Sequence, residues 1–271
     1  MTSAATKIAI AGAAGRMGRT LIEACCGTAD LQLVAALEAP GNALLGVDAG
    51  RLVGIEQCAV ALTDDVPTAI SQADVLIDFS HPQASLLHLE ACAKSGVRAV
   101  VGTTGFTNTQ WQRIDALAQN MAMVVAPNMS VGVTVCFKLL ELAAEILGDD
   151  VDIEIIEAHH RHKVDAPSGT AVRMGEILAA VLNRDLSQCA VYGREGHTGA
   201  RDSKTIGFET IRGGDIVGEH TVMFAGQGER LEITHRASSR VNFAQGALRA
   251  AHWVAGRQSG RFDMNDVLGL S

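Results

Sequence analysis

The sequence has few aromatic residues, few prolines and no excess of positive charge. Aromatic side chains make up 4% of the 271 residues and there are only 5 prolines, whereas 48% of the residues are hydrophobic. The core must therefore be built mainly from Ala, Val, Ile and Leu, which suits parallel strands covered by helices on both faces. The 28 glycines beside so few prolines indicate tight turns rather than disordered linkers.

The charge balance and the lack of long apolar runs exclude two classes of partner. The 30 acidic residues outnumber the 22 basic ones, for a net charge of −8, and no cluster of Lys and Arg breaks that balance. Neither nucleic acid nor an anionic membrane is an expected partner. No apolar run is long enough to cross a bilayer, and Met1–Thr6 is too short and polar for a secretory leader. We therefore expect a cytoplasmic protein.

The six cysteines show no Cys-x-x-Cys spacing and no pattern suited to a metal site. Several occur in apolar helical patterns, where a cysteine behaves as a small hydrophobic residue. We expect reduced thiols and no metal. The cysteines are Cys25, Cys26, Cys58, Cys92, Cys136 and Cys189.

From Lys7 to about Val131, short apolar runs alternate with longer amphipathic ones. Strands that alternate with helices of this length indicate right-handed βαβ units and a parallel sheet. The predicted fold class is therefore α/β, with a Rossmann-type dinucleotide-binding domain. The expected strands are Lys7–Ala11, Leu31–Leu37, Val75–Phe79, Ala99–Val101 and Met123–Ala126, and the expected helices are about Met17–Cys26, Pro82–Ser95 and Gln110–Gln119.

After Gly132 the pattern becomes that of an inserted α+β domain. Val151–Glu157 alternates apolar and acidic residues as a half-buried strand does. Further alternating runs predict a mixed or antiparallel sheet with one open face. These runs are Ser203–Thr210, Ile216–Phe224 and Arg230–Arg236. The expected helices are Val133–Leu147, Gly169–Leu182 and Phe243–Ala255, and Gly148 is the expected C-cap of the first of them.

The change in pattern places the domain boundaries. We expect residues 1–130 together with 241–271 to form the dinucleotide-binding domain, and residues 131–240 to form the inserted domain. The chain crosses between them near Asn128–Val131 and Arg240–Phe243, where we expect hinges.

A glycine-rich loop lies between the first strand and the first helix. Gly12–Gly18 has the pattern G-x-x-G-x-x-G rather than the commoner G-x-G-x-x-G. Such glycines allow a tight turn and the close approach of a pyrophosphate to the helix start. The loop alone is a weak signal, but Glu38 ends the second strand, where an acid binds the adenosine ribose. A solvated acid at a strand exit is the alternative.

Two later loops follow strands at their carboxyl ends. Gly102–Gly105 and Ala126–Met129 therefore lie at the edge where open α/β sheets bind ligands. They could hold the nicotinamide carboxamide, or they could be ordinary turns, and neither interpretation is favoured for either loop taken singly.

A cationic segment interrupts the otherwise acidic chain. His159, His160, Arg161, His162 and Lys163 are consecutive. Neighbouring cations lower one another's pKa unless an anion compensates, so the simplest purpose is to bind a carboxylate-bearing ligand and supply protons near neutral pH. A metal site is disfavoured, because no partner has ligand spacing and two cations would oppose a divalent ion. A solvated basic loop is the third interpretation.

The residues that follow lead into a helix. Asp165–Ala171 predicts a turn with Ser168 or Thr170 near the N-cap. Small residues there leave backbone N–H groups accessible to an anion. With the preceding cations they would clamp a small dicarboxylate, and a plain capping sequence is the alternative.

Four segments of the sequence resemble the dihydrodipicolinate reductase family, now called the 4-hydroxy-tetrahydrodipicolinate reductases. They are Gly12–Gly18, Gly102–Gly105, Glu157–Ala171 and Arg212–His220, and the third is highly specific. The resemblance extends in order over essentially the whole chain. It implies NAD(P)H-dependent reduction of a small cyclic dicarboxylate in the diaminopimelate route to lysine. It also implies a cytoplasmic enzyme, usually a homotetramer, whose inserted domain serves substrate binding and oligomerisation.

The resemblance further implies roles for individual residues. His159 is the proton donor and Lys163 assists as the second acid. The substrate carboxylates are held by His160, Ser168, Gly169 and Thr170. The cofactor-binding residues are Gly12, Ala13, Ala14, Gly15, Arg16 and Met17 for the phosphates, Glu38 for the ribose, and Gly102, Thr103, Thr104, Ala126, Pro127, Asn128 and Met129 for the nicotinamide side.

One departure from the family bears on the cofactor. Members that use both cofactors often carry Arg directly after the ribose acid, whereas Glu38 is followed here by Ala39 and Pro40. We expect NADH to be preferred to NADPH, although Arg16 could still reach a 2′-phosphate. The sequence assigns no role to Arg240, to His162 or to the loop Gly193–Arg201.

Two alternatives remain, one a related dehydrogenase and the other a protein of a different class. Another Rossmann-type dehydrogenase, of the homoserine or aspartate dehydrogenase kind, would need different acid and base residues and does not predict His159-His160-x-x-Lys163. A sensor that binds the nicotinamide cofactor without turnover has no need for a proton donor beside it.

Overall fold

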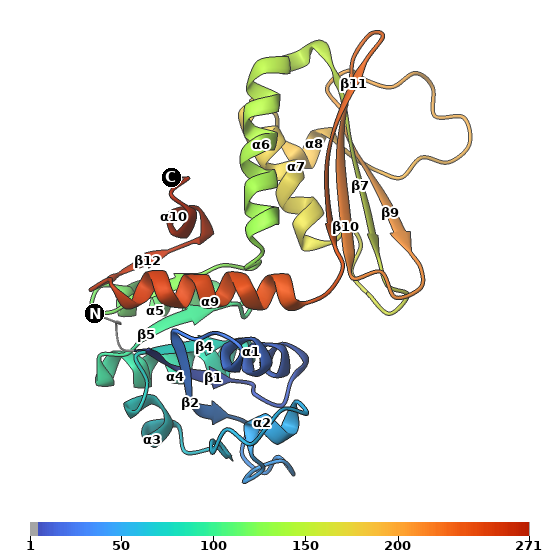
Figure 1. The fold of residues 1–271 in the computed structure, drawn as a ribbon. Helices are drawn as coiled ribbons and strands as arrows, with labels where there is room; N and C mark the ends of the chain where they lie inside the picture. The colour runs from blue at the N-terminus through green and yellow to red at the C-terminus, as the bar shows by residue number, and fades with distance from the viewer. Residues whose placement is uncertain (1–4, 271) are drawn as a thin grey trace. The chain divides into compact units, whose positions relative to one another are not determined.

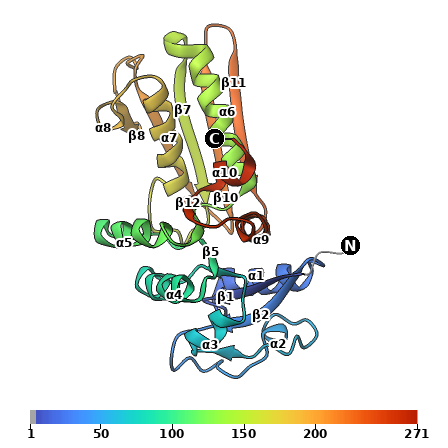
Figure 2. The same ribbon diagram turned by 90° about the vertical axis from the view of Figure 1, so that its left-hand side faces the viewer.

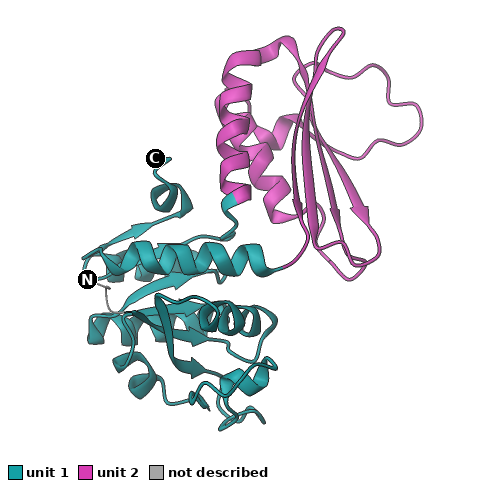
Figure 3. Ribbon diagram, viewed as in Figure 1, with its two compact units in different colours: residues 1–131, 240–271 teal, residues 132–239 magenta. Residues whose placement is uncertain are grey.

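The computed structural model describes residues 5–270. The chain divides into two compact units, Met1–Val131 with Arg240–Ser271 and Gly132–Ser239 (Figure 3). The first unit is therefore assembled from two separate parts of the chain. No helix among residues 5–270 is long and apolar enough to cross a membrane.

The first unit is built on a seven-stranded parallel sheet of order β12-β6-β5-β4-β1-β2-β3 (Figure 1). The strand order reverses at β1, which pairs with β2 on one side and β4 on the other, and ligands bind such sheets beyond the carboxyl ends at that point. The Rossmann-type α/β class is thus confirmed. The strands are β1 (Thr6–Ala11), β2 (Leu31–Leu37), β3 (Leu62–Thr63), β4 (Val75–Asp78), β5 (Arg98–Val101), β6 (Ala122–Val125) and β12 (Gly260–Phe262).

Helices cover both faces of this sheet (Figure 2). Successive strand residues point to opposite faces, so Ile8 and Ile10 pack with one helical layer while Ala9 and Ala11 pack with the other. Because both layers are apolar, the strands are continuous hydrophobic runs. One layer contains α1 (Arg16–Cys26), α2 (Ala49–Leu52), α9 (Val241–Ala255) and α10 (Met264–Leu268), and the other contains α3 (Val66–Ser71), α4 (Pro82–Ser95) and α5 (Asn108–Ala118).

The second unit contains a five-stranded mixed sheet of order β11-β10-β7-β9-β8. Strand β10 is antiparallel to β7 and β11, whereas β9 is parallel to β7 and β8. The predicted mixed sheet is therefore confirmed. The strands are β7 (Asp152–His159), β8 (Ala190–Tyr192), β9 (Ile206–Arg212), β10 (Gly218–Ala225) and β11 (Arg230–Ala237), and the helices are α6 (Val131–Leu147), α7 (Gly169–Val181) and α8 (Leu186–Cys189).

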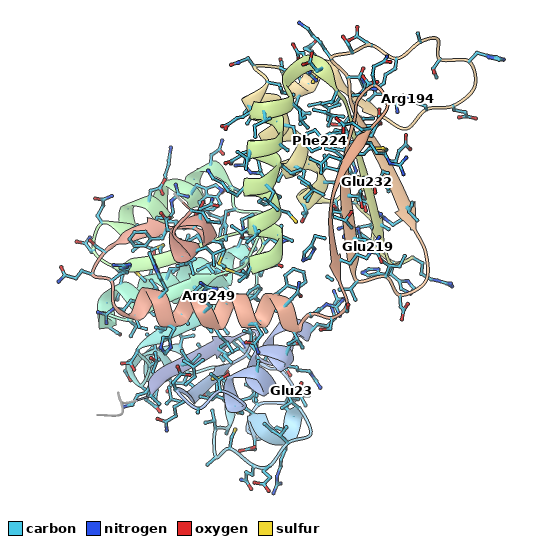
Figure 4. The ribbon with its side chains drawn as sticks, turned by 45° about the horizontal axis from the view of Figure 1, so that its top comes forward. Glu23, Arg194, Glu219, Phe224, Glu232 and Arg249 are labelled. Carbon is cyan, nitrogen blue, oxygen red and sulfur yellow. The ribbon has the colours of Figure 1, made fainter. Side chains whose placement is uncertain are left out.

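Helices α6 and α7 cover one face of the mixed sheet. Phe224 of β10 is buried between the sheet and these helices (Figure 4). The opposite face carries polar pairs, among them Thr221 with Thr234 at 3.0 Å between their hydroxyl oxygens. The alternating apolar and polar residues of the strands follow from this one-sided burial.

Candidate active site

The glycine loop between β1 and α1 is folded tightly. Gly12 has φ 71°, the left-handed conformation that favours glycine, and its carbonyl accepts a hydrogen bond from the Gly15 N–H at 3.0 Å. Gly15 is the N-cap of α1. A Cβ at Gly18 would overlap the Gly12 carbonyl oxygen and lie 2.7 Å from the Cα of Ala13. The loop can therefore rest against the helix only because Gly18 has no side chain.

Glu38 extends from the end of β2 toward this loop. Its Oε2 accepts a hydrogen bond from the Ala14 N–H at 2.8 Å, and its Oε1 accepts one from the Ala39 N–H at 2.9 Å. Glu38 also borders a cavity of about 480 Å³, and a carboxylate has lone pairs left for ligand hydroxyls. The lining residues are Gly12, Gly15, Leu37, Glu38, Ala39, Pro40, Asp64, Val66, Phe79, Ser80, His81, Ala84, Leu87 and His88.

A second cavity of about 300 Å³ brings the two later loops together. It is lined by Gly102 and by Pro127, Asn128 and Met129, with Met17, Phe79, Arg240 and Phe243. Phe79 borders both cavities, and a Cβ at Gly102 would overlap its ring. Three of the predicted cofactor residues are buried beneath these surfaces instead of lining them, namely Ala13, Thr103 and Ala126.

A buried polar network behind the cavities was not found from the sequence. Asp78, at the end of β4, is fully buried, and its Oδ2 lies 2.8 Å from His88 Nδ1. Its Oδ1 accepts hydrogen bonds from the Ser80 hydroxyl at 2.6 Å and the Ser80 N–H at 2.9 Å. Thr103 Oγ1 accepts from Ser85 at 2.8 Å. The network ties together the segments that follow β4 and β5.

In the second unit, Glu157 and His159 lie two residues apart on β7 and on the same face. The Nδ1 of His159 is 2.6 Å from Glu157 Oε2. Glu157 is only 1% exposed, and its two oxygens accept hydrogen bonds from Arg212 of β9 at 2.8 and 2.7 Å. A buried carboxylate is thus shared by a histidine and an arginine.

Ser168 and His220 extend this network. The Ser168 N–H donates to Glu157 Oε1 at 3.0 Å, and its hydroxyl lies 2.8 Å from His220 Nε2. The same hydroxyl accepts from the Ala171 N–H at 3.2 Å, so Ser168 rather than Thr170 is the N-cap of α7. The rings of His159 and His220 pack edge to face with centroids 5.1 Å apart.

The pKa values of these groups are shifted. Burial works against ionisation of Glu157, but hydrogen bonds from Arg212 and His159 hold its pKa below the usual range. Burial lowers the pKa of His159, and Lys163 and Arg212 lower it further while Glu157 opposes them. Burial, aided by the charge of His159, lowers the pKa of His220 to about 4. At neutral pH, Glu157 is therefore ionised and His220 is neutral.

The remaining residues of the cationic segment are arranged differently. Lys163 Nζ donates to both carboxylate oxygens of Asp165 at 2.8 Å, an ion pair that the sequence did not reveal. The rings of His160 and His162 have centroids 6.2 Å apart. His160 Nδ1 is buried without a hydrogen-bond partner among the residues that the structure describes. Those residues contain no group of three or more His, Cys, Asp or Glu side chains that could hold a metal ion.

A Rossmann-type unit with cavities along its glycine loop, joined to a unit that carries a histidine–carboxylate site, defines an oxidoreductase of the nicotinamide-dependent class. Residues 6–129 match the family model "Dihydrodipicolinate reductase, N-terminus" and residues 132–268 match "Dihydrodipicolinate reductase, C-terminus". The chain belongs to the dihydrodipicolinate reductase family. It is an oxidoreductase of the diaminopimelate route to lysine, and its fold and family support a nicotinamide cofactor.

Individual relatives agree along the full length. A 4-hydroxy-tetrahydrodipicolinate reductase of Alkalilimnicola ehrlichii is 61% identical over 98% of this chain and 99% of its own. One of Acinetobacter baumannii is 58% identical over 99% of this chain and 98% of its own. The solved structure of dipicolinate-bound dihydrodipicolinate reductase from Paenisporosarcina sp. TG-14 has a TM-score of 0.78 and 25% identity, covering 97% of this chain and 99% of that one.

Proposed function

We propose that this chain reduces 4-hydroxy-tetrahydrodipicolinate to tetrahydrodipicolinate, with hydride from NAD(P)H and a proton from His159. The observation that carries the proposal is the 2.6 Å contact between His159 Nδ1 and the buried Glu157, which leaves the other ring nitrogen for chemistry. A small dicarboxylate substrate is supported by the dipicolinate that the solved relative binds.

The first unit binds the dinucleotide. The tight turn that Gly12 and Gly18 allow leaves the N–H groups at the start of α1 to bind a pyrophosphate against Gly12–Met17, and Glu38 accepts the ribose hydroxyls from the wall of the larger cavity. Gly102–Thr104 and Ala126–Met129 serve the nicotinamide side, where their loops form the smaller cavity. The bound cofactor supplies the hydride.

The second unit binds and protonates the substrate. The ring receives hydride at one carbon and a proton from His159 at the adjacent carbon, and Lys163 assists as a second acid. His160, with its unpartnered Nδ1, and the helix start at Ser168–Thr170 hold the carboxylates. We also propose the tetrameric state that is usual in the family, which light scattering of the purified protein would check.

A coupled assay tests the activity. Aspartate semialdehyde, pyruvate and the preceding synthase generate the substrate in place, and consumption of NADH is followed by its absorbance. We expect consumption that depends on both the synthase and this protein. A rate equal to that of the blank without synthase, with NADH and with NADPH, would refute the proposed function.

The cofactor cavity favours NADH. Its wall contains the carboxylates of Glu38 and Asp64, and Ala39 stands where a cation would bind a 2′-phosphate. We expect a higher kcat/KM with NADH than with NADPH. Ala39→Arg should raise kcat/KM for NADPH by about tenfold, which corresponds to about 1.4 kcal/mol for one charge-assisted contact.

Arg16→Gln is the matched control for that cofactor preference. If Arg16 does not reach the 2′-phosphate, this change lowers kcat/KM for both cofactors by the same factor. A clear advantage for NADPH in the unaltered protein would contradict the proposed preference.

A further inference from the structure

Glu157 lies at the centre of the hydrogen-bond network around His159. We propose that Glu157 is a positioning residue that fixes the His159 ring with its Nδ1–H toward the sheet, so that Nε2 is the atom that delivers the proton. The proposal rests on the proposed function of His159 as the proton donor. It adds a carboxylate, and the arginine that holds that carboxylate, to the residues on which the reaction depends.

The Glu157 carboxylate is held by donors from three sides. On the neighbouring strands, Glu157 stands in register with Thr210 of β9 and His220 of β10. Besides Arg212 and the Ser168 N–H, the Thr210 hydroxyl donates to Oε1 at 3.3 Å. A carboxylate offers about four lone-pair sites, and those of Glu157 are essentially filled. The side chain therefore cannot turn away from His159 without losing several hydrogen bonds at once.

This contact determines which ring nitrogen carries the mobile proton. An ionised carboxylate only accepts hydrogen bonds, so His159 Nδ1 must be the protonated nitrogen that faces Glu157. In the reaction the Nε2–H bond breaks and a C–H bond forms on the substrate. The ring is left neutral with its Nδ1–H still donated to Glu157, and solvent restores the proton on Nε2.

Gly218 keeps the second nitrogen uncovered. A Cβ on Gly218, in β10, would lie 3.1 Å from His159 Nε2 and 3.4 Å from Cδ2. Any side chain at this position would therefore press on the edge of the ring that delivers the proton. The φ of Gly218 lies outside the left-handed region, so the backbone conformation does not require glycine here. The close approach of the His159 ring does.

The charges around His159 act in opposite directions. Glu157 favours the protonated ring, whereas Arg212 of β9 and Lys163 disfavour it. His220 of β10 is neutral at neutral pH and adds no charge. The carboxylate of Asp165 is paired with the ammonium group of Lys163. Arg212 stabilises the ionised form of Glu157, which keeps the carboxylate an acceptor instead of a competing acid.

Glu157→Gln separates the charge of this residue from its shape. The amide oxygen can still accept from Nδ1–H, but the negative charge that favours protonated His159 is lost. Because the donor is the protonated ring, kcat falls as pH rises through the pKa of His159. In the variant this decline should move to lower pH, and kcat at neutral pH should fall by about tenfold. The loss is smaller than the rate acceleration of about 10²–10⁴-fold that a general acid supplies, because His159 itself is still present. KM for the cofactor should stay unchanged.

Glu154→Gln is the matched control on the same strand. Glu154 is also held by arginine, with two hydrogen bonds from Arg194 at 2.9 and 2.8 Å and one from Arg201 at 2.9 Å, and it lies on the face of β7 opposite to His159. It should keep the pH profile of the unaltered protein. An unchanged profile and kcat in Glu157→Gln, beside a strongly impaired His159→Gln, would refute the positioning role alone. An unimpaired His159→Gln would refute the proposed proton donation by His159, on which this inference rests.

Gly218→Ala tests the same geometry without altering Glu157. The added methyl group should lower kcat at every pH by crowding Nε2, with little effect on cofactor KM. If Glu157→Gln does not fold, this variant still tests the ring orientation on which the proposal depends, because wild-type kcat in Gly218→Ala would contradict Nε2 as the donating atom.

Discussion

Replacing His159 by glutamine is expected to lower kcat by about 10²–10⁴-fold while the cofactor Kd changes by less than about threefold. Glutamine keeps a polar side chain beside Glu157 but has no proton to deliver at neutral pH. Hydride transfer without a matched proton leaves charge on the ring of the substrate. Steady-state kinetics in the coupled assay, together with a cofactor titration by fluorescence, measure the two quantities separately.

His162→Gln is the matched control for this change. It removes an imidazole three residues away on the same segment, where His162 is exposed and its ring lies beside that of His160. It should leave kcat within about twofold, because a surface substitution usually changes the stability by less than about 0.5 kcal/mol and His162 has no proposed part in the proton transfer. A His159→Gln variant with normal kcat and an altered KM would instead show that His159 is not the proton donor.

Adding a methyl group at Gly18 is expected to weaken cofactor binding by about 100-fold, or about 2.7 kcal/mol, which is the size of one or two lost hydrogen bonds to a charged phosphate. The Cβ would overlap the Gly12 carbonyl oxygen and crowd Ala13, so the glycine loop must move off α1. The N–H groups at the helix start then no longer meet the pyrophosphate. Calorimetric titration with NADH measures the loss, and a thermal melt measures the accompanying destabilisation.

Gly27→Ala provides the control at the other end of the same helix. Gly27 has φ −83°, and a Cβ there would meet the Glu23 carbonyl oxygen at an ordinary 3.5 Å. Its cofactor affinity should match that of the unaltered protein. Normal NADH binding by a folded Gly18→Ala variant would show that this loop does not hold the phosphates.

The elements that could be predicted from the sequence are those with a long hydrophobic pattern. Leu31–Leu37 and Pro82–Ser95 have the predicted bounds because two-sided burial and a full helical period leave clear signals. Strand β3 and strand β12 have two and three residues, too few for any period. They were missed because their strand conformation depends on pairing with β2 and β6 at the edges of the sheet.

The site was predictable only where it is local in the sequence. Residues two apart on a strand share a face, so the proximity of Glu157 to His159 could have been inferred from spacing. Arg212 could not, because its contact with Glu157 depends on the register that pairs His159 with Arg212 across β7 and β9. Likewise, the contact of Asp78 with His88 depends on how α4 packs on β4. The predicted grouping of His160 with the helix start stays a proposal.

The two-part first unit has a consequence for biosynthesis. Helix α9 packs in the same core as α1, and it approaches the loop before α6 so closely that a Cβ at Gly246 would overlap the Met129 carbonyl oxygen. A nascent chain that has emerged only as far as β6 therefore exposes the apolar surface that α9 later covers. Folding of the cofactor-binding unit must wait until the whole inserted unit has been translated. Premature termination between residues 132 and 239 would leave an aggregation-prone fragment with its core open.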